Sequence, residues 1–330
     1  MVVHTPYIIS RRTAPFFGLV ALLAIIALGP LPAHAAEKLV AAVLSSDIGR
    51  YKDAHRAFVK TLSQKGYDQS NVDIIVQSPN PDPISWANSI RKVNAIGADV
   101  IITYGAPVTL AAIGEIDETP IVFVDVYGPV ETGIAKSMTT TGRNLTGISS
   151  KVPMITLIKT AAEIRPIRNM GVIYNSREVG SLVQLKEIKR IAAQQGFAVV
   201  EANVATNAGL DAALNVMLSR VDFLYVSECT AGSKGFEKIV HKANEHKIPV
   251  ISQMPDASDK GALMALEVSP VEQGQLAGEE AVRILGGKKA AQIPIATPKK
   301  IELIVNMHAA KALDLHIPFQ VLSAATKILK

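Results

Sequence analysis

Short apolar runs alternate with longer amphipathic segments along most of this chain. The apolar runs are nearly continuous in Val, Ile and Leu, which indicates strands buried on both faces of a parallel sheet that helices cover. In the first half of the chain, strands are predicted over residues 39–44, 72–76, 99–103 and 121–124. The segments between them predict helices over 54–65 and 84–96, each followed by a glycine that can end a helix. This order is typical of an α/β lobe.

A second series of the same kind begins after Gly147. Its predicted strands span 170–174, 197–200, 223–226, 248–251, 263–266 and 301–305, and its predicted helices span 155–164, 179–195, 210–220, 234–245 and 271–285. The repeated rhythm predicts two Rossmann-like α/β lobes with a ligand cleft between them. A Ser/Lys/Pro stretch over 149–153 is the expected crossover, and the C-terminal part returns to both lobes. We assign residues 36–148 plus about 268–296 to lobe 1, and 149–267 plus about 297–330 to lobe 2.

The N-terminal 35 residues have the three parts of a secretory signal peptide. Arg11 and Arg12 precede an uncharged apolar stretch over 16–29, and small residues at Ala33 and Ala35 suit cleavage before Ala36. The alternative is an uncleaved anchor. Cleavage is favoured because the apolar stretch is short for a bilayer and a Gly-Pro pair breaks it just before the small residues. The sequence therefore predicts export to the periplasm.

Charge and cysteine content exclude some classes of protein. The full chain has a formal net charge of +5, and without residues 1–35 it keeps 32 basic and 29 acidic residues, a charge of +3. Because the two signs are mixed along the chain, no basic stripe for nucleic acid is predicted. The single cysteine, Cys229, cannot form an intramolecular disulfide.

Ligands of open α/β sheets bind beyond the carboxyl ends of the strands, so polar residues there are candidate binding residues. This rule selects Asp47, Asn80, Tyr104, Ala106, Asp125, Tyr127, Asn175, Glu178, Glu228, Gln253 and Glu267. The acids in this set outnumber the nearby Arg50 and Arg177. An acidic site predicts a neutral or cationic hydrogen-bond donor as the ligand rather than a carboxylate.

Several of these residues have a structural alternative. Asp125 can accept hydrogen bonds from a ligand or cap the following turn, and Tyr127 can stack on a ligand or pack in the hinge. We expect alanine at either position to weaken binding with little loss of thermal stability. Glu178 can contact the ligand or stabilise the first turn of its helix. For Trp86, packing of its helix is favoured over a place in the cleft wall.

Motifs for catalysis and metal binding are missing. His241 and His246 are five residues apart on a predicted helix, which puts them about 140° apart and not on one face. The sequence has no G-x-S-x-G or H-E-x-x-H motif. We therefore expect no metal, no cofactor and no enzymatic activity.

The chain resembles the ABC transporter substrate-binding family that includes tryptophan- and tyrosine-binding proteins. The segments that carry the resemblance span nearly the whole predicted mature chain: 119–123, 128–130, 144–147, 170–175, 247–250, 260–263 and 297–306. The resemblance implies the type I periplasmic binding protein fold, in which two lobes close on a small solute and present it to a permease of the inner membrane. It also implies a monomer that binds no nucleic acid. The alternative is an extracytoplasmic sensor that passes the same closure to a membrane receptor.

The resemblance also bears on the binding residues. Ser181 matches the serine that relatives use in the loop after Asn175, which adds it to the predicted set, but Gly180 stands where they have asparagine. Cys229, beside Glu228, stands where they have the acid that holds an ammonium group, and Gln253 begins a Gln-Met pair in place of Ser-Asp. Ala106 replaces a threonine. These departures argue against a standard aromatic amino acid as the ligand.

Overall fold

The computed structural model describes residues 38–330, without the side chain of Asn207. The predicted signal peptide, residues 1–35, lies outside the described residues. Among residues 38–330, no helix has the length and apolar character needed to cross a membrane.

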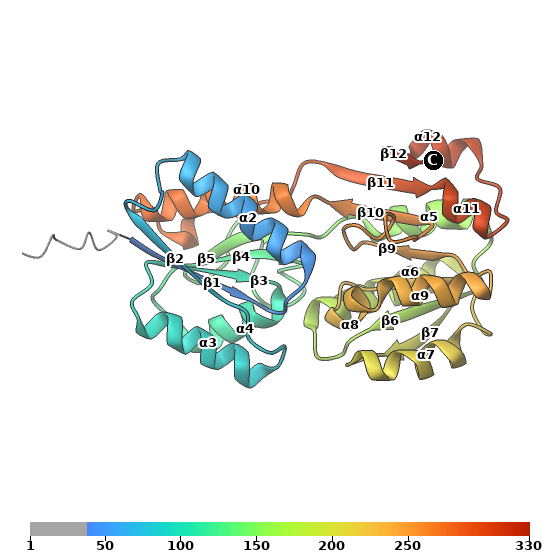
Figure 1. Ribbon diagram of the computed structural model, residues 1–330, viewed down its shortest axis with the longest axis horizontal. Coiled ribbons are helices and arrows are strands. Elements are labelled where there is room, and N and C mark those ends of the chain that lie inside the picture. The colour runs from blue at the N-terminus through green and yellow to red at the C-terminus, as the bar shows by residue number, and fades with distance from the viewer. Residues whose placement is uncertain (1–37) are drawn as a thin grey trace, which may run out of the picture. The chain divides into compact units, whose positions relative to one another are not determined.

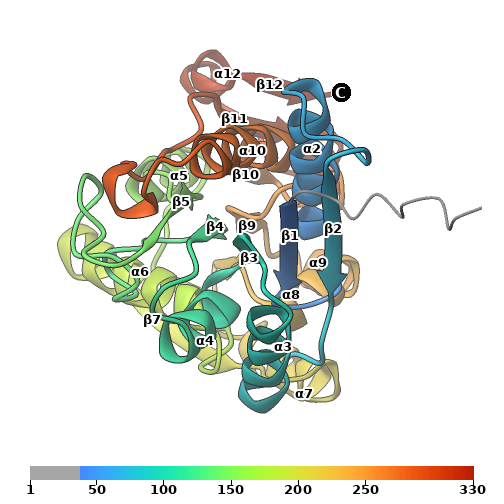
Figure 2. The same cartoon turned by 90° about the vertical axis from the view of Figure 1, so that its left-hand side faces the viewer.

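Lobe 1 is built on a five-stranded parallel sheet in the order β2-β1-β3-β4-β5 (Figure 1). Its strands are β1 (Lys38–Leu44), β2 (Val72–Gln77), β3 (Val100–Tyr104), β4 (Ile121–Val126) and β5 (Leu145–Ser149). One face is covered by α2 (Gly49–Gln64) and α10 (Pro270–Leu285), and the other by α3 (Pro83–Ala95) and α4 (Ala106–Glu115). Figure 2 shows α2 and α10 on one side of this sheet and α3 and α4 on the other.

Lobe 2 is built on a seven-stranded sheet in the order β12-β11-β10-β9-β8-β6-β7, parallel except between β10 and β11. Its strands are β6 (Asn169–Tyr174), β7 (Ala198–Asn203), β8 (Phe223–Val226), β9 (Val250–Ser252), β10 (Met264–Val268), β11 (Ile301–Asn306) and β12 (Lys327–Leu329). One face carries α5 (Met154–Ile164), α6 (Val179–Gln195), α11 (Met307–Ala312) and α12 (Phe319–Ala324), and the other carries α7 (Leu210–Met217), α8 (Thr230–Lys234) and α9 (Phe236–Glu245).

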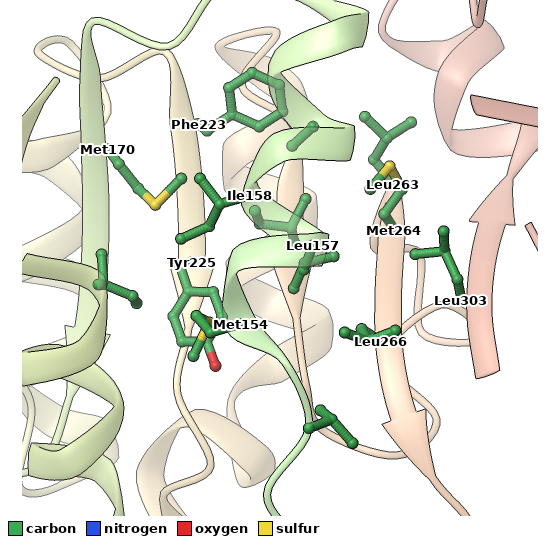
Figure 3. Packing of buried hydrophobic residues seen from close by; sticks show 14 of the residues in the cluster. Met154, Leu157, Ile158, Met170, Phe223, Tyr225, Leu263, Met264, Leu266 and Leu303 are labelled. Atoms are coloured by element: carbon green, nitrogen blue, oxygen red, sulfur yellow. The ribbon is translucent and has the colours of Figure 1, made fainter. Parts of the chain in front are cut away.

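The core of lobe 2 lies between α5 and the middle of the sheet (Figure 3). Met154, Leu157 and Ile158 of α5 point toward Tyr225 of β8 and Leu266 of β10. These side chains are at most 3% exposed. Burial of this kind is the main force that holds a helix on a sheet.

Three segments connect the two sheets. Residues 150–153 lead from β5 to α5, Ser269 links β10 to α10, and residues 286–300 lead from α10 back to β11. The last segment first runs beside β5, where Ser149 N donates to the carbonyl of Ala296 at 2.9 Å. Two α/β lobes with largely parallel sheets confirm the predicted fold class.

Glu280 of α10 is a buried acid inside lobe 1. Its side chain is 3% exposed, and its Oε2 accepts a hydrogen bond from Thr146 Oγ1 of β5 at 3.2 Å. Burial raises the pKa of this carboxyl from about 4.5 to about 8, although the Thr146 hydroxyl opposes the change. Glu280 is therefore neutral in the folded protein at pH 7.

We expect Glu280→Gln to remove a pH dependence of stability. Since the folded protein holds the Glu280 proton more tightly than the unfolded chain, this stabilising contribution is complete below pH 4.5 and is lost as pH rises toward 8. Between pH 5 and pH 8, the free energy of unfolding of the wild type should therefore fall by on the order of 3 kcal/mol more than that of the variant. Urea unfolding at the two pH values measures this, with the exposed neighbour Glu279→Gln as control. Parallel pH profiles of the wild type and Glu280→Gln would contradict the burial argument.

Candidate ligand-binding site

The site lies where the strand order reverses in both sheets. In lobe 1 the reversal is between β1 and β3, and in lobe 2 it is between β6 and β8. Such a reversal opens a crevice at the carboxyl ends of the strands. The strand ends of the two lobes are in contact, because Thr230 Oγ1 of α8 lies within hydrogen-bonding distance, 3.1 Å, of Ser46 Oγ after β1.

A buried ion pair occupies the lobe 1 side. Arg50, in the first turn of α2, donates from Nε to Asp125 Oδ2 at the end of β4 at 2.6 Å. Their side chains are 7% and 4% exposed. Arg50 Nη2 donates to the hydroxyl of Tyr51 at 3.3 Å, and Gln273 Nε2 of α10 donates to Asp125 Oδ1 at 3.4 Å. An ion pair this well buried keeps its strength because water does not screen it.

The backbone of β4 is arranged to bring Asp125 to this position. Asp125 has a φ of 56°, in the left-handed region that aspartate tolerates better than most residues. The pairing with β5 is irregular between Phe123 and Val126, as at a β-bulge. Val124 packs beneath α2 and α10 whereas Val126 packs on the opposite face, although residues two apart in a regular strand share a face. The irregularity thus allows Asp125 to pair with α2.

On the lobe 2 side, Glu178 ties two loops together. It accepts hydrogen bonds from Asn175 Nδ2 at 2.8 Å, from the backbone N of Thr230 at 2.9 Å and from Thr230 Oγ1 at 3.2 Å. Burial raises the pKa of Glu178, and the bonds from Thr230 and Asn175 oppose this. Ser181 Oγ accepts from the backbone N of Asn175 at 3.0 Å and lies 2.6 Å from Ser227 Oγ. These polar groups have protein partners and brace the loops.

Glu228, directly after β8, faces the ion pair of lobe 1. Its backbone N donates to Gln184 Oε1 of α6 at 2.8 Å. Burial and the nearby Asp125 carboxylate raise the pKa of Glu228 to about 8, against the opposing effect of Arg50. The raised pKa favours the protonated Glu228 carboxyl, which can donate as well as accept. The buried polar residues at this contact form the interlobe cluster: Arg50, Asp125, Gln184, Glu228 and Gln273.

Three other predicted residues are buried close to the cluster or to the connecting segments, each with a protein partner. Tyr104 is fully buried beneath α2, with its hydroxyl 3.1 Å from His55 Nδ1. The hydroxyl of Tyr127 donates to Glu187 Oε2 of α6 at 3.0 Å. Gln253 Nε2 donates to the carbonyl of Val152 at 3.3 Å, so it holds the segment that joins β5 to α5.

The remaining four predicted residues lie away from the interlobe cluster and the loops beside it. The side chain of Asp47 is 63% exposed and pairs with Lys52 at 2.6 Å, and Asn80 is exposed before α3. Ala106 is the first residue of α4 and is buried in the core of lobe 1. Glu267 is opposite Glu302 of the neighbouring strand β11, and burial with the nearby acids Asp256, Glu302 and Asp259 raises its pKa to about 7. Asn80 follows the edge strand β2, Ala106 begins a helix, and Glu267 has an antiparallel neighbour, which places these three residues away from the cluster.

Sequence reasoning missed Gln184 and Gln273, and it weighed Arg50 only as a countercharge. All three lie on helices, where the strand-end rule does not search. The available signal was a polar side chain on a buried helix face, since Gln184 lies between Val183 and Leu185 and all three are buried. Arg50 is the buried cation of the interlobe cluster.

The thiol of Cys229 has a structural role. It accepts a hydrogen bond from the backbone N of Gly232 at 3.3 Å and caps α8. Burial raises the pKa of Cys229 to about 11, which keeps the thiol protonated and unreactive at neutral pH. Within residues 38–330, no three His, Cys, Asp or Glu side chains are grouped as metal ligands would be.

The lobes are closed on each other. A cavity of about 20 Å³ remains between the start of α2 and the loops of lobe 2, with room for about one water molecule. Its lining includes Gly49 and Arg50 from lobe 1 and Ser233, Met254 and Lys260 from lobe 2. This cavity is too small for an organic solute.

Comparisons with known proteins agree with this architecture. The family model described as "ABC transporter substrate binding protein" matches residues 40–329. A tyrosine-binding protein of Clostridioides difficile is 30% identical over 264 residues, covering 79% of this chain and 76% of the relative.

The solved structures that are similar to this chain include a ligand complex and a ligand-free, open form. The structure of an ABC domain from Streptococcus pneumoniae in complex with L-Trp has a TM-score of 0.84 at 21% identity and covers 89% of this chain and all of that one. The ligand-free, open structure of a substrate-binding protein with adhesive properties from Clostridium difficile has a TM-score of 0.67 at 28% identity and covers 89% of this chain and 99% of that one.

Proposed function

Because the chain belongs to the ABC transporter substrate-binding protein family, we propose that it is the solute-binding component of an ABC importer. The family is a class of extracytoplasmic binding proteins rather than enzymes. In this proposal the predicted signal peptide directs the protein to the periplasm. There the two lobes close on a small organic solute, and the closed protein docks on a permease of the inner membrane as a monomer.

The interlobe cluster is the observation that supports this proposal. It combines Arg50 of α2, Asp125 of β4 and Gln273 of α10 from lobe 1 with Gln184 and Glu228 from lobe 2. A solute that binds to both halves is favoured only when the lobes are together, so its binding shifts the equilibrium toward the closed form. The TM-score is 0.84 with the ligand-bound structure and 0.67 with the open one, which supports a closed arrangement.

The charges of the cluster favour an uncharged or zwitterionic solute. Asp125 is neutralised by Arg50, and the raised pKa of Glu228 favours its neutral form. Glu178 has its own donors. Dianions are disfavoured because they would approach Asp125 and Glu178. The relatives named for tyrosine and tryptophan place amino acids among the solutes to test.

The first experiment is native mass spectrometry of the purified mature protein, followed by denaturing extraction of any bound molecule. One small molecule per chain supports the proposal. Trp86, the single tryptophan of the chain, provides a second readout, because it is buried and its Nε1 donates to the carbonyl of Ser45 beside the interlobe cluster at 2.9 Å. Its fluorescence should change when the extracted solute is added back to the emptied protein. An empty protein that no small metabolite stabilises would argue against a solute receptor.

A further inference from the structure

Three buried polar atoms of the interlobe cluster have no hydrogen-bond partner among the described residues. They are Arg50 Nη1, Gln184 Nε2 and Gln273 Oε1. The three side chains are 7%, 0% and 1% exposed. A buried donor or acceptor without a partner is costly, so such atoms are rare in folded proteins. Three such atoms lie around Asp125 and Glu228. This indicates that the three groups are arranged to bind a molecule other than the chain itself.

The partners of these side chains define what each free atom offers. Arg50 uses Nε for Asp125 and Nη2 for Tyr51, which leaves Nη1 as a free donor. Gln184 must present its oxygen to the backbone N–H of Glu228, so its free atom is the donor Nε2. Gln273 must present its nitrogen to Asp125, so its free atom is the acceptor Oε1. Lobe 1 therefore offers one charged donor and one acceptor, and lobe 2 offers one neutral donor.

We propose that Arg50 is a ligand-binding residue, which donates from Nη1 to a carboxylate or carbonyl oxygen of the solute while Gln184 donates to the solute from the other lobe. This inference rests on the proposed function. Asp125 is a positioning residue, since it holds the guanidinium group from its Nε side, and the Nε2 of Gln273 in turn holds Asp125. The ring of Tyr51 lies 4.9 Å from the guanidinium carbon and packs against it.

This arrangement selects a class of solute. Arginine stays protonated, so a simple amine would bring a second positive charge to Nη1 and leave it without an acceptor. A solute with a carbonyl or carboxylate oxygen gives Nη1 its missing partner in a site that excludes water. Gln273 Oε1 and the carboxyl of Glu228 can accept hydrogen bonds from N–H or O–H groups of the solute. The selected class is an uncharged or zwitterionic solute with at least one such oxygen.

Matched solutes and matched variants test this inference by isothermal titration calorimetry. The probes are the twenty common L-amino acids, uracil and D-glucose, with the decarboxylated amine of each amino acid that binds, such as tyramine for tyrosine. For the wild type we expect binding of at least one probe with a carbonyl or carboxylate oxygen. Binding of its decarboxylated counterpart, where that probe is an amino acid, should be at least tenfold weaker.

The variants separate the role of Arg50 from a structural one. Arg50→Met combined with Asp125→Asn avoids a lone buried charge and should weaken binding of the oxygen-bearing probe at least tenfold while reducing its advantage over the amine. Gln184→Leu, which leaves the ion pair intact, should weaken the same probe. The matched control is Arg56→Met on the same helix, whose side chain is 75% exposed and which should bind as the wild type does.

The outcomes distinguish this inference from the proposed function. Equal binding of acid and amine by the wild type, or an unchanged ratio in the Arg50 double variant, would overturn the role of Arg50. A protein that retains a solute after purification but binds none of the oxygen-bearing probes would overturn the solute class alone. A protein that retains nothing and binds nothing would overturn both.

Discussion

Asp125→Ala is expected to destabilise the unliganded protein by about 3–5 kcal/mol, because it leaves the charge of Arg50 buried without its partner. For a chain of this length that loss corresponds to a melting temperature lower by on the order of 5–10 °C. The ion pair joins Arg50 Nε to Asp125 Oδ2 at 2.6 Å with both side chains buried. Thermal unfolding of the purified, ligand-free variant measures the effect. This expectation corrects the one drawn from sequence alone, which foresaw little loss of thermal stability.

Two further variants make the result interpretable. Asp47→Ala removes a carboxylate from an exposed pair with Lys52 near the start of the same helix, and it should lower the melting temperature far less than Asp125→Ala does. Asp125→Asn keeps a hydrogen-bond acceptor for Arg50 and should fall between the two. If Asp125→Ala melted no lower than Asp47→Ala, the ion pair would not be a stabilising element of the unliganded protein.

Gly274→Ala is expected to disrupt the packing of α10 on α2, with a loss of about 3 kcal/mol or more. A Cβ atom at Gly274 would lie 2.0 Å from the carbonyl oxygen of Ala54 and 2.9 Å from the Cβ of Ala57. Because the nearer atom belongs to the backbone of a helix, no side-chain rotation can relieve the contact. The two helices would have to move apart, and urea unfolding would report the change.

Gly114→Ala in α4 is the matched control for this prediction. A Cβ atom at Gly114 would meet nothing within 4 Å. Alanine also has the higher helix propensity, so this variant should be as stable as the wild type or more stable by up to about 1 kcal/mol. Equal stabilities of the two alanine variants would show that α10 can shift on α2 without cost.

The long apolar strands and the amphipathic helices could be predicted from the sequence, because the spacing of their apolar residues indicates which positions are buried. Helix α4 could not be predicted, since it begins with Ala106-Pro107 and its residues do not divide into an apolar face and a polar face. Strand β5 was hidden by Thr146 and Gly147, whose places depend on distant partners: Thr146 binds Glu280, and a Cβ at Gly147 would lie 2.1 Å from the carbonyl of Phe123. The six-residue helices α11 and α12 are too short to show a period.

For the candidate site, the sequence predicted the strand ends but not the helix residues that complete them. Asp125 lies at the end of β4 and Glu228 follows β8, and because the carboxyl ends of these strands converge, a topological rule could select both residues. Arg50, Gln184 and Gln273 reach the cluster through the packing of α2, α6 and α10, which only the folded chain defines. The left-handed backbone of Asp125 is likewise a tertiary effect, because it depends on the pairing of β4 with β5.

The late position of α10 in the chain has a consequence for folding. All five strands of the lobe 1 sheet lie before residue 150, whereas the helix that covers them together with α2 begins at Pro270. Because synthesis starts at the N-terminus, the elements of lobe 2 up to β10 are made while one face of lobe 1 still lacks this helix. A nascent or truncated chain that stops before α10 would leave Ala54 and Phe58 of α2 uncovered and prone to aggregation. Neither lobe is complete until the residues after β10 have been made, so neither can be obtained by cutting the chain once.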